Sequence, residues 1–135
     1  MALIEWKESY SVNVTEIDNE HKKLIELINN LHEAMMSGKS KEVMGKILDE
    51  LIQYTLYHFA TEEKFFDKYN YPESEIHKKQ HADLVEQVAA LQKKFKGGER
   101  VLTIDVLNFL KDWLNDHIIG SDIKYAHFLK SHGVN

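Results

Sequence analysis

The sequence predicts an all-α protein, an up-down-up-down four-helix bundle with an N-terminal arm packed along the bundle. Three observations support this fold class. Apolar residues recur every three or four positions through four long segments, which is the period of an amphipathic helix. A single proline and six glycines leave these segments with few interruptions. The connections between the segments are short, and short connections favour antiparallel packing of consecutive helices.

The chain of 135 residues is expected to form one domain, residues 1–135. Residues 1–14 are expected to be the arm, anchored by Trp6 and Tyr10, and residues 120–135 a C-terminal segment. Between them the apolar pattern predicts four helices, at residues 15–37, 41–69, 74–96 and 103–119.

Capping and turn residues support these limits. Thr15 followed by Asp18 resembles a capping box at the start of the first helix, with Asp in place of Glu. Ser40 is a natural N-cap for the second helix. Gly38 marks the first connection, and the two glycines at 97–98 mark the third.

The composition excludes several classes of protein. Acidic residues outnumber basic ones by 22 to 17, and no basic stripe is visible, so we expect no nucleic-acid partner. The absence of cysteine excludes disulfides, iron–sulfur clusters and thiolate zinc sites. Charges interrupt the first ten residues, and no apolar run approaches the roughly 20 residues of a membrane span. We therefore expect a cytoplasmic protein with no membrane span.

Two pairs of polar residues stand four positions apart within helical segments, His58 with Glu62 and His77 with His81. Residues at this spacing lie on one face of a helix, with Cβ atoms about 6 Å apart. Each pair can therefore offer two metal ligands from a single helix. Two such pairs also occur by chance in helical proteins, so the pairs alone do not establish a metal site.

The bundle topology brings further histidines to the same level. The start of the first helix, the end of the second, the start of the third and the end of the fourth meet at one end of an up-down bundle. His21 lies early in the first helix and His117 late in the fourth, so both fall in the layer of the two pairs. This agreement predicts a metal centre inside the bundle. The other histidines are interpreted as surface or core-edge residues: His32, His127 and His132.

A second carboxylate is harder to assign. Asp122 follows His117 by five positions, which rotates it by about 140° on a regular helix. Asp122 can join the centre only if the helix loosens or ends, and Gly120 between them is a candidate place for a break or a π-type bulge. On spacing alone Asp116 and Glu63 compete with it. The ligand hypothesis thus predicts an irregularity between His117 and Asp122.

Five imidazoles and two carboxylates exceed what one metal ion normally takes, and they suit two ions bridged by the carboxylates. Imidazole and carboxylate ligands fit iron, manganese, copper or zinc, although zinc would usually take four ligands. Two six-coordinate irons that also share an oxide or hydroxide would keep one open position. A small molecule would bind at that position.

Four segments carry a family resemblance. IDNEHKKLIELIN, YTLYHFATEE, YPESEIHKKQH and WLNDHIIGSDIKY resemble the hemerythrins, most closely the single-domain bacterial members, the bacteriohemerythrins. The resemblance implies two non-haem iron ions bridged by an oxide or hydroxide. It also implies the ligands: His77, His81 and His117 on the filled iron, His21 and His58 on the iron with the open position, and Glu62 and Asp122 as bridges. An apolar O2 pocket is implied at Leu24, Phe59, Trp113, Leu114 and Ile118.

The resemblance implies reversible O2 binding for storage, delivery or local sensing, and not catalysis. Two other classes of function compete, namely a di-iron oxidase or peroxide-handling enzyme, and a protein that handles iron or nitric oxide. Di-iron bundles that activate O2 use a ligand set that is richer in glutamate than the histidine pairs of this chain. We expect O2 as the ligand, a monomer, and an unidentified protein acceptor of O2.

Overall fold

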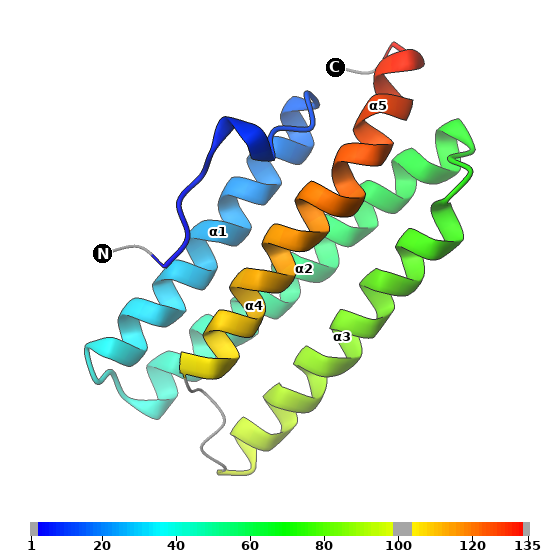
Figure 1. Cartoon of the computed structure of the whole chain (residues 1–135). Coiled ribbons are helices and arrows are strands. Elements are labelled where there is room, and N and C mark those ends of the chain that lie inside the picture. Colours follow the sequence, from blue (N-terminus) through cyan, green and yellow to red (C-terminus); the bar gives the residue numbers. More distant parts are fainter. Residues whose placement is uncertain (1–2, 99–103, 134–135) are drawn as a thin grey trace.

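The computed structural model describes residues 3–98 and 104–133. The fold class is confirmed, because four long helices form a bundle and the described residues contain no strand (Figure 1). The elements are a 3₁₀ turn Glu8–Tyr10, α1 Thr15–Met36, α2 Lys41–Tyr69, α3 Ser74–Lys96, α4 Ile104–His117, a π turn Ile118–Asp122 and α5 Ile123–Ser131. The expected start of the fourth helix at residue 103 lies outside the described residues.

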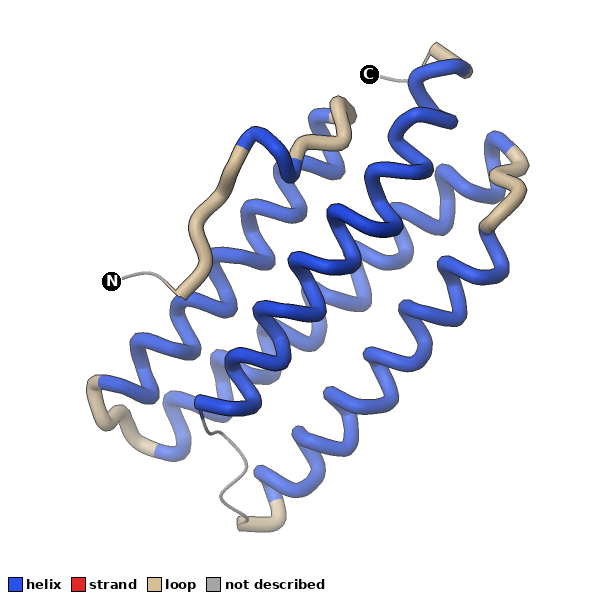
Figure 2. Tube along the Cα trace, viewed as in Figure 1, coloured by secondary structure: helices blue, strands red, loops and turns tan. Residues whose placement is uncertain are grey.

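The helices follow the up-down order. α1 contacts α2 and α4, and α2 contacts α3. The connection from α1 to α2 lies at one end of the bundle, and the connection from α2 to α3 lies at the opposite end (Figure 2). The fourth helix does not stop at residue 119, because the π turn passes directly into α5 and the helical rod continues to Ser131. None of the described helices is long and apolar enough to cross a membrane.

The N-terminal arm is fastened to the bundle by specific hydrogen bonds. The backbone of Ile4 exchanges two hydrogen bonds with the side-chain amide of Asn29 on α1, at 2.9 and 2.8 Å. The Tyr10 hydroxyl is 2.8 Å from the side-chain oxygen of Asn115 on α4, and the Tyr10 side chain is buried. The arm therefore lies along the helices, as Figure 1 shows.

The predicted caps have different outcomes. Ser40 caps α2 by accepting a hydrogen bond from the Val43 N–H. The prediction of a capping box at Thr15 and Asp18 is wrong, since Val14 occupies the N-cap position of α1 and its side chain makes no capping hydrogen bond. Asp18 turns instead to the arm, where it accepts hydrogen bonds from the Ser11 hydroxyl and the Val12 N–H. The carboxylate thus fixes the entry of the arm into α1.

The buried apolar residues form two clusters at different levels of the bundle. The larger cluster includes Leu24 and Leu84, and the smaller one includes Ile17 and Tyr71. On α1 the polar position His21 stands between Ile17 of the smaller cluster and Leu24 of the larger one, and on α2 Glu62 stands between Phe59 of the larger cluster and Phe66 of the smaller one. The polar layer is therefore enclosed between two apolar layers, which keep water away from it.

Candidate metal centre

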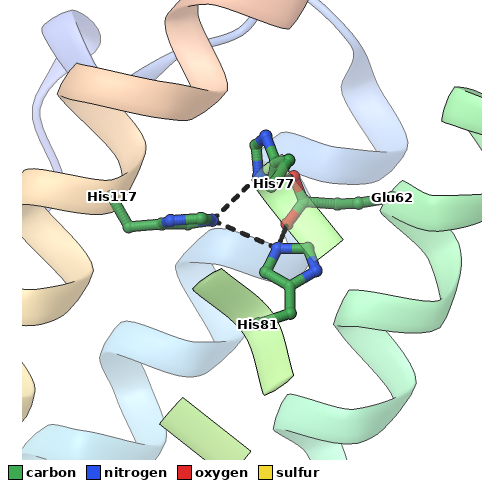
Figure 3. Close-up of side chains that lie close together, drawn as sticks. All are labelled: Glu62, His77, His81 and His117. Atoms are coloured by element: carbon green, nitrogen blue, oxygen red, sulfur yellow. Dashed lines mark hydrogen bonds and ion pairs between the residues drawn. The ribbon is translucent and has the colours of Figure 1, made fainter. Parts of the chain in front are cut away.

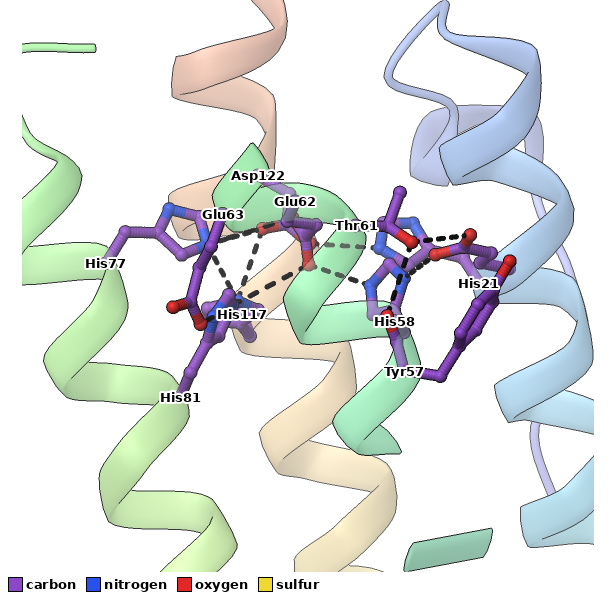
Figure 4. A network of polar contacts seen from close by, with 11 residues as sticks. His21, Tyr57, His58, Thr61, Glu62, Glu63, His77, His81, His117 and Asp122 are labelled. Atoms are coloured by element: carbon purple, nitrogen blue, oxygen red, sulfur yellow. Dashed lines mark hydrogen bonds and ion pairs between the residues drawn. The ribbon is translucent and has the colours of Figure 1, made fainter. Parts of the chain in front are cut away.

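The seven predicted ligands come together in the interior of the bundle. They form two groups of four that share Glu62, and within each group the ligand atoms lie within 4.8 Å of one another. Figure 4 shows them converging from all four helices. The groups are Glu62, His77, His81 and His117, and His21, His58, Glu62 and Asp122.

Three imidazoles of the first group point their Nε2 atoms at one place (Figure 3). The His117 Nε2 lies 3.0 Å from that of His77 and 3.1 Å from that of His81. A hydrogen bond between two imidazole nitrogens needs a proton on one and a lone pair on the other. A cation at the meeting point would satisfy all three lone pairs at once.

The second group pairs each histidine with one carboxylate. The His58 Nε2 lies 2.7 Å from a Glu62 oxygen, one helical turn along α2. The His21 Nε2 lies 3.1 Å from Asp122 Oδ2. The rings of His21 and His58 meet edge to face, with centroids 4.6 Å apart. This group therefore offers two imidazoles and two carboxylates.

Both carboxylates reach toward the two groups. Asp122 Oδ1 lies 2.9 Å from the His77 Nε2 and 3.2 Å from the His117 Nε2, while its Oδ2 faces His21. Glu62 Oε1 faces His58 and also lies 3.6 Å from the His81 Nε2, while its Oε2 lies 3.9 Å from the His77 Nε2. Each carboxylate could thus give one oxygen to each of two neighbouring ions.

The π turn explains how Asp122 reaches the centre. The Ile123 N–H bonds to the Ile118 carbonyl, five residues earlier, so the turn contains one residue more than an α-helical turn. This extra residue brings positions five apart toward the same face, and the predicted irregularity is confirmed. Gly120 lies in the turn, but a Cβ there would meet nothing within 4 Å, so close packing does not require glycine.

The seven residues fit a metal centre by a further criterion. The carboxylates of Glu62 and Asp122 are fully buried, and none of their four oxygens has a hydrogen-bond partner. Neither nitrogen of His21 has one, although its Nε2 lies close to Asp122. Leaving a buried polar group unsatisfied costs about 1–3 kcal/mol. Bound cations would remove this cost and neutralise the two carboxylates.

The same layer shifts the protonation of its histidines in the metal-free protein. Burial has the largest influence on His58 and lowers its pKa, but the charge of Glu62, the hydrogen bond to Glu20 and the close contact with Glu62 outweigh it and raise the pKa to about 10. Burial lowers the pKa of His81 to about 3, with help from neighbouring imidazoles and against the charge of Glu62. His58 therefore carries a proton at neutral pH that metal binding must displace.

Metal binding is expected to strengthen as the pH rises from the ordinary histidine value of about 6.5 toward 10, because the small deprotonated fraction of His58, the form that can bind a metal, grows with each pH unit over this range. Competition titrations of the metal-free protein with cobalt(II) and a chelator would measure this slope. We expect up to about a tenfold gain in affinity per pH unit. His32→Ala, outside both groups, should keep the slope, and an affinity that is constant with pH would contradict the assignment.

The remaining candidates lie elsewhere. Asp116 is exposed, and Glu63 approaches the outer nitrogen of His81 at 3.1 Å instead of entering either group. The three other histidines are half-buried or exposed and belong to neither group: His32, His127 and His132.

Two buried polar residues beside the centre are missing from the sequence-based prediction. Glu20 on α1 contacts His58, and Tyr125 on α5 is fully buried with a hydroxyl that has no hydrogen-bond partner. Burial and the charges of Glu62 and Asp122 raise the pKa of Tyr125 well above its usual value. Tyr125 follows Asp122 by three positions, a spacing that places both on one helix face and could have revealed it.

An apolar cavity borders the centre. It is lined by four of the five predicted pocket residues. The volume of the cavity is about 30 Å³, which is enough for a very small ligand. Ile118 does not line it, although it is buried beside Leu114. The four lining residues are Leu24, Phe59, Trp113 and Leu114.

Two aromatic rings separate the cavity from the imidazoles. Phe59 stacks on His81 with ring centroids 3.8 Å apart, and Trp113 stacks on His117 at 4.5 Å. Thr55 also lines the cavity, but its hydroxyl donates a hydrogen bond to the Leu51 carbonyl. The walls are therefore apolar and offer little to a water molecule.

Comparison with known proteins identifies the family. Residues 12–126 match the hemerythrin HHE cation binding domain. The chain belongs to the hemerythrin family. The bacteriohemerythrin of Methylococcus capsulatus is 38% identical over 132 residues, which cover 97% of this chain and 100% of that protein. The bacteriohemerythrin of Stenotrophomonas maltophilia is 34% identical and covers 98% of this chain and 85% of that protein.

Solved hemerythrin structures share the fold. A wild-type hemerythrin crystal structure superposes with a TM-score of 0.88 at 37% sequence identity, covering 93% of this chain and 96% of that chain. A hemerythrin-like protein of Naegleria gruberi is 36% identical and covers 92% of both sequences. The buried His, Glu and Asp clusters are consistent with a hemerythrin di-metal site.

Proposed function

We propose that this hemerythrin binds O2 reversibly at two iron ions and does not catalyse a reaction. The observation that carries the proposal is two buried ligand groups that share one carboxylate, next to an apolar cavity. Iron held there would supply electrons and an open coordination position for O2. The proposed ligands are the seven residues of the two groups, with Glu62 and Asp122 as the bridges.

The surroundings of the centre favour binding without onward chemistry. Imidazoles dominate the ligand set, and the cavity walls carry no free acid that could donate a proton to bound oxygen. Phe59 and Trp113 cover His81 and His117 on the cavity side and exclude water there. Storage, delivery and sensing of O2 all use reversible O2 binding, so the proposal covers all three. The cytoplasmic location, the monomeric state and a protein acceptor of O2 remain predictions.

An oxygen electrode separates the proposal from its rivals. The fully reduced, iron-loaded protein should take up about one O2 per pair of iron ions and then stop, even when a slow reductant is present. Continuous O2 consumption would indicate an oxidase. Uptake of many more than two iron ions per chain would indicate an iron store.

Leu114→Ser is expected to shorten the lifetime of the oxygenated protein. Leu114 lines the cavity, and a hydroxyl there would hold water close to the centre. We expect autoxidation to accelerate by about tenfold, together with about 2–4 kcal/mol of lost stability from the core substitution. The measurement is the rate at which the oxygenated colour decays to the ferric form.

Leu31→Ser is the matched control for that experiment. Leu31 is fully buried in the same apolar cluster but does not line the cavity, so its replacement should cost similar stability and leave the autoxidation rate unchanged. Equal rates in the two variants would mean that Leu114 does not protect the centre.

A further inference from the structure

A buried carboxylate outside the seven ligands contacts His58 at the ring nitrogen that faces away from the centre. Glu20 lies on α1, and its residue is only 4% exposed. Its Oε1 lies 2.7 Å from the His58 Nδ1, and its Oε2 accepts a hydrogen bond from the Thr61 hydroxyl at 3.0 Å. Both oxygens therefore have a partner, and both partners are on α2.

The two nitrogen atoms of the His58 ring have different partners, and this difference indicates the role of Glu20. The Nε2 of His58 faces Glu62 at 2.7 Å, inside the second ligand group. When Nε2 gives its lone pair to a metal, the ring proton must be on Nδ1, where it donates to the Glu20 carboxylate. Such an outer carboxylate fixes the tautomer and the orientation of a ligating imidazole and makes it a stronger donor.

The Thr61 hydroxyl holds Glu20 in this position. Thr61 follows His58 by three residues, so both lie on the same face of α2 and turn toward α1, as Figure 4 shows. The Thr61 oxygen is also 3.2 Å from the Tyr57 carbonyl, so its single proton is shared between two acceptors. Glu20, Thr61 and His58 thus form a connected polar network between the two helices.

We propose that Glu20 is a positioning residue for the metal ion held by His21 and His58. The inference rests on the proposed di-iron function and adds to it a group that sets the donor strength of one ligand. His58 is the imidazole of this group with an outer carboxylate, since the outer nitrogen of His21 has no hydrogen-bond partner. Loss of Glu20 should therefore weaken the binding of this ion more than the binding of the other ion.

Glu63 provides an internal comparison. It approaches the His81 Nδ1 at 3.1 Å, in the other ligand group. Its side chain is 34% exposed, whereas that of Glu20 is 5% exposed. Water screens the exposed carboxylate, so its effect on the imidazole is weaker than that of the buried one. The two metal positions consequently differ in the strength of their outer support.

Cobalt(II) titration of the metal-free protein tests the inference. The wild type should bind two equivalents, and Glu20→Ala should weaken one of the two binding steps by roughly 10–100-fold. Glu63→Ala should weaken the other step by less than about threefold. If the wild type does not bind two equivalents, the proposed di-metal function fails. If it does, and Glu20→Ala titrates like the wild type, only the positioning role of Glu20 is overturned.

A spectroscopic readout separates positioning from a general loss of structure. In the zinc-loaded wild type, the His58 Nδ1 proton should give a strongly downfield NMR signal because it donates to a carboxylate. Glu20→Gln keeps an acceptor but removes the charge, so the signal should remain and move upfield. Thr61→Val should move it in the same direction by less. If Glu20→Ala does not fold, an unchanged proton shift in Glu20→Gln overturns the inference.

Discussion

Glu62→Ala is expected to remove iron from both positions, because Glu62 is the residue common to the two ligand groups. The wild type should contain about two iron ions per chain after reconstitution, and the variant fewer than about 0.5. Substitutions at His58 or His81 should each affect mainly one position, since each of these residues belongs to one group. Elemental analysis of the purified proteins measures the effect directly.

The size of this effect follows from the charge balance of the centre. Without Glu62 the buried layer loses one of its two fully buried carboxylates, and five imidazoles and Asp122 would face the positive ions. Glu63→Ala is the matched control, because the same residue type is removed one position along α2 from a partly exposed site. A Glu62→Ala protein that still holds two iron ions would show that Glu62 is not a shared ligand.

The spacing of the histidines is sufficient to predict most of this centre. A four-residue separation on a helix fixes the relative direction of two side chains, so the sequence alone places His58 with Glu62 and His77 with His81. The up-down topology then determines which helix ends meet. Ser40 at the start of α2 is predictable for the same local reason, since a serine cap acts within one turn.

Other features depend on interactions between distant segments. The Asp18 carboxylate had two available roles, and hydrogen bonds to Ser11 and Val12 in the arm replaced the local capping box. Asp122 reaches the centre only through the π turn, and the sequence predicts that irregularity from the ligand hypothesis and not from helical periodicity. Glu20 stands in the second turn of α1 among other charges, so its sequence context suggests a solvated residue, and only the packing of α1 on α2 buries it.

Reversible colour formation is the second large effect that we expect. The reduced iron-loaded protein should be colourless, and admission of O2 should produce a visible charge-transfer band within seconds. The apolar cavity and the stacked rings of Phe59 and Trp113 limit the access of water, so the oxygenated form should persist long enough to be reversed. The band should disappear when O2 is removed.

The most direct measurement is therefore a cycle of reduction, oxygenation and purging, followed by visible absorption spectroscopy. We predict that the band appears with O2, disappears under inert gas without added reductant, and returns to at least about 80% of its first intensity on a second exposure, because the dry surroundings limit oxidation. Irreversible oxidation to the ferric form on the first exposure, with release of peroxide, would contradict reversible O2 binding and would favour a redox enzyme.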